Sequence, residues 1–279
     1  MKTKTAEKEG VRLRAQELGA DLVGVLNLAD YKSPRSPDPR KYLAGARSVI
    51  VLGFRVLSGA YDNDSWTRMH SYLYSGEVAG NMAVYSLARE LEDNHGARTL
   101  IIHPHRPFDL TEETYRRPIG SLSLRHAAVQ SGIAVFGKNT LALTPHFGPR
   151  LFFFGLLSSL DLPTDPSQVG DYRPCEACSF PCVEACPGNA FIKEGGEIRT
   201  VSHRCVRQSQ PADPGHFMRF LLELAEKPTL EERKAMLKSA RFFAHVQCLQ
   251  GYHLYYCQHC TKACPTNMTG KAGDTKRTG

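Results

Sequence analysis

The sequence lacks the features that would place the chain in or across a membrane. No apolar run approaches the length of about 20 residues that a membrane-spanning helix needs. The longest run, LFFFGLLSSLDL at residues 151–162, predicts a buried strand instead. The first residues also lack the apolar core of a secretory signal and a twin-arginine pair. We therefore expect a cytoplasmic protein that has no membrane partner and whose thiols stay reduced.

Cysteine is absent from the first 174 residues, yet nine cysteines follow between positions 175 and 264. In a reducing compartment this concentration indicates metal or redox chemistry more than disulfides. A chain of 279 residues can bury a substantial core, so its stability does not require cross-links. The net charge of +7 is scattered, and its densest part is the end of the chain, where we expect a disordered basic tail over residues 269–279. Charge alone gives no reason to expect a nucleic-acid partner.

Helical and strand patterns alternate up to about residue 161. Apolar spacing and glycine stops predict helices at residues 5–18, 75–96 and 122–131, and strands at residues 21–26, 45–57 and 97–103. Residues 140–162 are expected to form two strands joined by a Pro/Gly turn. This pattern predicts an α+β domain over residues 1–165. A proline-rich linker at residues 163–174 leads into a cysteine module over residues 166–268, with helices inserted near residues 216–246.

The cysteines form two copies of a ferredoxin-like motif. The first run is Cys-x2-Cys-x3-Cys-x3-Cys-Pro from Cys175, and the second is Cys-x2-Cys-x3-Cys-Pro from Cys257. In two-cluster ferredoxins the cysteine before proline binds the other cluster. This rule gives one [4Fe-4S] cluster the ligands Cys175, Cys178, Cys182 and Cys264. It gives a second cluster Cys186, Cys257 and Cys260, and the spacing leaves Cys205 and Cys248 as candidates for the missing ligand.

Simpler readings of the cysteines explain less. A zinc ribbon would use the two Cys-x2-Cys pairs that begin at Cys175 and Cys257, and would leave Cys182, Cys186 and Cys264 without a role. Purely structural thiols or disulfides leave the repeated motif unexplained. The first run also has one more residue between Cys178 and Cys182 than the usual bacterial motif, which predicts a small bulge at positions 180–181.

The segment before the cysteines, SGIAVFGKNTLALTPHFGPR, resembles the corrinoid-binding core of the epoxyqueuosine reductase and reductive dehalogenase superfamily. The stretches AQELGADLVGV and YLAGARSVIVLGF are also similar to that superfamily, and the resemblance spans roughly residues 15–267. It implies a nitroreductase-like, cobalamin-binding domain followed by a ferredoxin-like module with two [4Fe-4S] clusters. It also implies that Cys205 completes the second cluster and that Cys248 is a spare thiol.

Two turns are the candidates for cobalamin contact. The first turn offers backbone amides, a cation and polar side chains for the amide or phosphate groups of a corrinoid, and consists of Gly137, Lys138, Asn139 and Thr140. The second contributes Thr144, His146 and Gly148. The GKN segment alone also fits an ordinary turn, and we read His146 as a turn residue in preference to an axial cobalt ligand.

One departure from the superfamily concerns the proton donor. Pro118 stands where the resemblance places an aspartate of the epoxyqueuosine reductases, and no acidic residue occurs between Glu113 and Asp161. Respiratory dehalogenases are similar in overall chemistry but use a tyrosine with a basic partner. By that comparison the catalytic candidates are Tyr72 or Tyr74 with Arg125, although each tyrosine also fits a packing role.

The resulting functional prediction is a cobalamin-dependent iron-sulfur reductase that acts on a small organic substrate. A low-potential carrier such as ferredoxin or flavodoxin would supply its electrons. Two alternatives stay open. The chain would be a corrinoid-binding electron-transfer protein or cobalamin reductase without an organic substrate of its own, or a ferredoxin-like partner subunit without a corrinoid.

Overall fold

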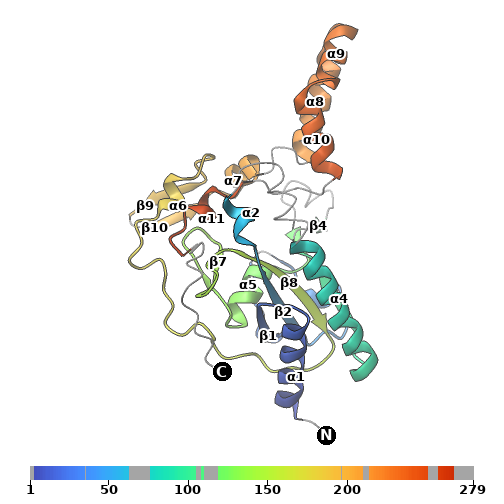
Figure 1. Cartoon of the computed structure of the whole chain (residues 1–279), viewed down its shortest axis with the longest axis vertical. Helices are drawn as coiled ribbons and strands as arrows, with labels where there is room; N and C mark the ends of the chain where they lie inside the picture. Colours follow the sequence, from blue (N-terminus) through green and yellow to red (C-terminus); the bar gives the residue numbers. More distant parts are fainter. Residues whose placement is uncertain are drawn as a thin grey trace.

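The computed structural model describes residues 3–34, 36–62, 76–104, 108–109, 119–195, 197–209, 214–250 and 257–266 (Figure 1). A four-stranded antiparallel sheet lies at the centre of the N-terminal part. Its strands, in spatial order, are β1 (Leu22–Asn27), β2 (Ser48–Arg55), β8 (Leu151–Ser158) and β3 (Thr99–Ile102). The two central strands are buried along almost their whole length. Continuous burial of this kind requires cover on both faces of the sheet.

Helices supply that cover. On one face, α1 (Lys4–Glu17) and α4 (Gly76–His95) place Val11 and Leu87 in a core with Phe154. On the other face, α5 (Leu124–Gln130) packs Ala127 against Val51. Shorter elements complete this part: η1 (Pro39–Lys41), α2 (Ser58–Asp62), β4 (Phe108–Asp109) paired with β5 (Ile119–Gly120), and β6 (Val135–Phe136) paired with β7 (Ala142–Leu143).

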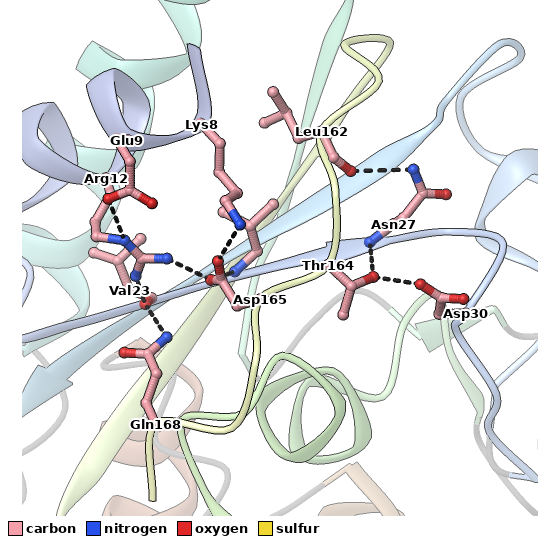
Figure 2. Close-up of polar contacts among 11 residues, drawn as sticks. Lys8, Glu9, Arg12, Val23, Asn27, Asp30, Leu162, Thr164, Asp165 and Gln168 are labelled. Atoms are coloured by element: carbon pink, nitrogen blue, oxygen red, sulfur yellow. Dashed lines mark hydrogen bonds and ion pairs between the residues drawn. The ribbon is translucent and has the colours of Figure 1, made fainter. Parts of the chain in front are cut away.

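After β8 the chain runs along the open edge of β1, and residues 161–168 form a strap there (Figure 2). Asp165 exchanges two hydrogen bonds with Val25: its backbone N–H donates to the Val25 carbonyl at 2.9 Å, and its carboxylate accepts from the Val25 N–H at 2.7 Å. The same carboxylate is buried and paired with Lys8 at 2.8 Å and Arg12 at 2.6 Å. The strap therefore covers an edge that would otherwise offer unpaired backbone groups.

The cysteine module follows the strap. Its elements are α6 (Pro181–Glu184), the hairpin of β9 (Phe191–Glu194) and β10 (Glu197–Thr200), α7 (Ser202–Ser209), α8 (Pro214–Glu226), α9 (Leu230–Leu237), α10 (Ala240–Gln250) and α11 (His259–Lys262). Helices α8, α9 and α10 project away from the rest of the molecule (Figure 1). Inside this projection the ring of Phe220 is fully buried and stacks on Phe242, with centroids 5.8 Å apart.

The predicted helices at residues 5–18, 75–96 and 122–131 correspond to α1, α4 and α5, so the mixed α and β character is confirmed. Residues 140–162 contain the two expected strands, β7 and β8, with the Pro/Gly turn between them. The two strands have different partners: β7 pairs with β6, while β8 lies between β2 and β3 in the main sheet. In the described part of the chain, no helix is both long and apolar enough to span a bilayer.

Candidate functional site

The structure collects four cysteines of the predicted first cluster into one group. Cys182 lies in α6, Cys264 follows α11, and these two helices are in contact. Both thiols are buried. The pKa of the Cys182 thiol is raised to about 11, mainly because the thiol is buried. The neighbouring charges of Cys264, Cys178 and Cys175 raise it further. The four sulfurs therefore lie within electrostatic reach of one another, and we name them the first cysteine group.

Four of the other five cysteines form a second cysteine group. Burial raises the pKa of the Cys260 thiol to about 12, and the charges of Cys257, Cys205 and Cys186 raise it further. Cys205 comes from α7, so the exposed helix contributes the member that the motif spacing left open. Cys248 lies in α10, and its side chain is outside the described residues. The roles of all eight cysteines as cluster ligands stay predictions.

Polar hydrogens point at several of these sulfurs. Backbone N–H groups donate to sulfur from Phe180 to Cys178 at 3.3 Å, from Ala190 to Cys186 at 3.4 Å and from Lys138 to Cys175 at 3.5 Å. The Thr266 hydroxyl lies 3.0 Å from the Cys264 sulfur. Such bonds stabilise thiolates and tune the potential of bound iron-sulfur clusters. Among the described residues, no group of three or more His, Cys, Asp or Glu side chains is arranged closely enough to hold a single metal ion.

The extra residue in the first motif is accommodated by an unusual backbone conformation. Phe180 has φ 63° and ψ 50°, in the left-handed region that bulky residues rarely adopt. This conformation aims the Phe180 N–H at the Cys178 sulfur and lets Pro181 begin α6. The bulge expected at positions 180–181 is therefore present, and it adds a sulfur hydrogen bond.

The GKNT turn closes the β6–β7 hairpin and touches the first cysteine group. Thr140 takes a left-handed conformation with φ 63°, and its N–H donates to the Gly137 carbonyl at 2.8 Å. The Asn139 side chain is buried and accepts from the Leu141 N–H at 3.2 Å, so it stabilises the turn. The Lys138 backbone reaches the Cys175 sulfur, which places this turn directly beside the first group.

Lys138 and Arg125 have protein partners that the sequence did not reveal. The Lys138 ammonium pairs with Glu197 of β10 at 2.7 Å, a contact between two solvent-exposed side chains. An exposed pair of this kind contributes only about 0–1 kcal/mol to stability. Arg125, predicted as a basic catalytic neighbour, donates to the Thr140 carbonyl at 2.6 Å. This contact makes it a support of the GKNT turn.

The second candidate turn also adjoins the first group. Thr144 is fully buried and exchanges backbone hydrogen bonds with Gly148 at 3.0 and 2.9 Å. Gly148 has φ +54°, and a Cβ atom there would lie 2.2 Å from the carbonyl oxygen of Thr266. Only glycine permits this approach to the segment after Cys264. His146 is exposed at the tip of the turn. The predicted tyrosines, Tyr72 and Tyr74, and the position of Pro118 lie outside the described residues.

Comparisons with known proteins were made for the whole chain. No protein-family profile matches it. It is 29% identical to an epoxyqueuosine reductase of Pseudomonas aeruginosa over 181 residues, which are 64% of this chain and 46% of that protein. It is 37% identical to a tetrachloroethene reductive dehalogenase of Desulfitobacterium hafniense over 68 residues, or 24% of this chain and 12% of the dehalogenase.

Solved structures share the fold. An epoxyqueuosine reductase in complex with a modified tRNA-Tyr stem loop matches with a TM-score of 0.58 and 19% identity, over 94% of this chain and 65% of that one. A reductive dehalogenase described with a B12-dependent mechanism matches with a TM-score of 0.52 and 15% identity, over 91% of this chain and 37% of that one. The chain thus spans less than two thirds of these relatives.

The fold and the cysteines define a mixed α and β protein whose central sheet is joined to a module of two four-cysteine groups. In sequence and fold the chain resembles the superfamily that contains the epoxyqueuosine reductases and the reductive dehalogenases.

Proposed function

We propose that this protein is an iron-sulfur and cobalamin-dependent reductase. One observation carries the proposal: both turns that resemble a corrinoid-binding core lie beside the first cysteine group. The GKNT turn donates to Cys175, and the TPHFG turn packs on Thr266, whose hydroxyl is 3.0 Å from the Cys264 sulfur. A cofactor bound at these turns would lie close to the four sulfurs of that group. Oxidoreductase names among the sequence relatives support the reaction class.

The residues fit the proposed groups. The first cysteine group would hold one [4Fe-4S] cluster, and the second group, completed by Cys205, would hold another. The two turns would bind cobalamin, whose reduced cobalt supplies the low-potential chemistry. Arg125 fixes the backbone of Thr140, and buried Asn139 holds the turn closed. Under this proposal residues 1–165 form a nitroreductase-like domain and residues 166–268 a ferredoxin-like module, both in the cytoplasm.

Anaerobic purification tests the cofactor content. We expect about eight irons and eight sulfides per chain, together with the electron paramagnetic resonance of reduced [4Fe-4S] clusters. Reconstitution with cobalamin should give stoichiometric retention after gel filtration. One zinc and no sulfide would contradict the iron-sulfur assignment. Iron without cobalamin retention would support a ferredoxin-like subunit instead.

A pair of serine variants tests the second group. Cys205→Ser should lose about half of the iron, because four thiolates hold each cluster. Cys248→Ser is the matched control and should keep the full iron content. If only Cys248→Ser lost iron, the ligand assignment in the second group would be wrong.

Two substrate classes compete. A small organic substrate agrees with the absence of the expected aspartate, and Tyr72 or Tyr74 would then supply the proton. A tRNA substrate is favoured by the solved relative that binds a tRNA stem loop, and this likeness runs against the expectation from charge that nucleic acid is not a partner. Turnover with a low-potential donor separates them, using a halogenated phenol as one substrate and epoxyqueuosine-containing tRNA as the other. Cobalt reduction without loss of either substrate would indicate an electron-transfer protein.

A further inference from the structure

Helix α7 carries an exposed basic surface and contributes Cys205 to the second cysteine group. Its sequence, SHRCVRQS, contains His203, Arg204 and Arg207 and no acidic residue, and all three basic side chains are exposed. Cys205 lies between them and is also exposed. Cys205 is more exposed to solvent than the other seven grouped cysteines, which are half-buried or buried. The second group therefore comes closest to solvent at this helix.

Close packing holds α7 against the loop that carries Cys186. A Cβ atom at Gly188 would lie 2.9 Å from the Gln208 Cβ atom and 3.1 Å from the Arg204 carbonyl oxygen, so glycine allows the helix to approach the loop. The Arg204 guanidinium also donates to the Asn189 carbonyl at 3.1 Å. The outer face of α7 is thus fixed directly over the second cysteine group.

The charges near α7 are mainly positive. Arg199 of β10 is exposed three residues before the start of α7. Helix α11, which carries Cys260, adds His259 and Lys262. Among the described residues, three exposed acids lie on neighbouring elements: Glu184 on α6, Glu194 on β9 and Glu197 on β10. Glu197 pairs with Lys138. A surface with this excess of positive charge attracts a negatively charged partner and speeds its encounter.

We propose that α7 is the docking surface for an acidic one-electron carrier protein. The inference rests on the proposed function, because it requires iron at the second cysteine group. The acidic face of the reduced carrier would bind His203 and Arg207. The one electron that the carrier gives up would pass to the iron that Cys205 would help to hold. An RNA partner is also negatively charged and would be complementary to the basic surface of α7. His203 and the arginines could also stack on bases. The exposed cysteine of the second group, Cys205, is what favours an electron carrier over RNA, because RNA binding makes no use of a sulfur ligand at the surface.

The test uses the full chain after anaerobic reconstitution, with a reduced acidic [2Fe-2S] ferredoxin as the probe. Arg207→Glu is expected to weaken ferredoxin binding and slow electron transfer by about tenfold at low salt, and to reduce the salt dependence of both. Arg207→Gln should show a smaller effect in the same direction. Lys41→Glu makes the same charge change on exposed η1 and should behave like the unaltered protein.

Controls separate this proposal from the proposed function. Iron content and reduction by dithionite, which needs no docking, should be unchanged in Arg207→Glu. If the unaltered protein contains no iron, the proposed function fails, while ferredoxin binding can still be measured. Equal ferredoxin binding by Arg207→Glu and the unaltered protein would overturn the docking proposal. The proposal would also be overturned if Arg207→Glu bound a tRNA stem loop more weakly than the unaltered protein but bound ferredoxin equally well. Helix α7 would then be an RNA-binding surface.

Discussion

Individual buried charges decide how firmly the strap is attached. The Asp165 side chain is 1% exposed and forms ion pairs with Lys8 and Arg12. It also accepts the Val25 N–H. Removing one partner of such a buried set leaves the others desolvated and unpaired.

Asp165→Asn should therefore lower the free energy of unfolding by about 3–5 kcal/mol, because Lys8 and Arg12 lose their counter-charge. Urea denaturation followed by circular dichroism measures the change. Asp161→Asn is the comparison, since its side chain is 23% exposed and its pairs with Lys4 and Arg47 lie at the surface. That variant should lose only about 0–1 kcal/mol. An equal decrease in the free energy of unfolding in both variants would show that burial of Asp165 does not determine its contribution to stability.

Thiol reactivity should differ between the cysteines of the iron-free protein. Burial and neighbouring sulfurs raise the pKa of Cys182 and Cys260 above that of an ordinary thiol, so little reactive thiolate exists at pH about 8. Cys205 is exposed. We expect iodoacetamide to label Cys205 well before Cys182 and Cys260, as measured by peptide mass spectrometry over time. Labelling of Cys182 first would show that its surroundings are more open than the structure has them.

Among the elements, α7 depends on a single glycine for its position. Gly188 follows Cys186 and Pro187, and a side chain at this position would clash with Gln208 and the Arg204 carbonyl of α7. The helix in turn brings Cys205 to the second cysteine group.

Gly188→Val should push α7 away from the Cys186 loop and reduce the iron content from about eight to about four per chain, because the second group loses one ligand. Iron analysis after anaerobic purification gives the answer. Gly59→Val is the matched control, since nothing lies within 4 Å of a Cβ atom at Gly59. Retention of all iron in Gly188→Val would mean that Cys205 is not positioned by this contact.

For the whole molecule, the strap sets where the N-terminal part ends. The predicted boundary at residue 165 falls inside the strap, because Gln168 also donates its N–H to the Gly132 carbonyl at 2.8 Å and its side-chain amide to the Val23 carbonyl at 3.3 Å. A cut at residue 165 would remove these bonds.

A fragment of residues 1–160 should aggregate, because the edge of β1 would be uncovered and its backbone groups would be free to pair with another chain. A fragment of residues 1–172 keeps the strap and should stay monomeric. Size-exclusion chromatography with light scattering distinguishes the two outcomes. Equal behaviour of the fragments would show that the strap does not protect the edge.

Local patterns in the sequence were sufficient for α1, α4, α5 and the long buried strands. Helical spacing with a glycine stop, and continuous apolar runs, depend only on neighbouring residues. The pairing of β7 with β6, and the β9–β10 hairpin, were not predicted. Short strands carry little periodic signal, and their partners are chosen by contacts made elsewhere in the fold.

The sequence by itself determined that seven cysteines form two repeated motifs and that a GKNT turn precedes them. Motif spacing is a local property, so it can be read along the chain. Only the tertiary structure brought Cys205 to Cys260, placed the GKNT turn on Cys175, and made Arg125 a support of that turn. These contacts join residues that are distant in sequence, and they depend on how helices, turns and the strap pack together.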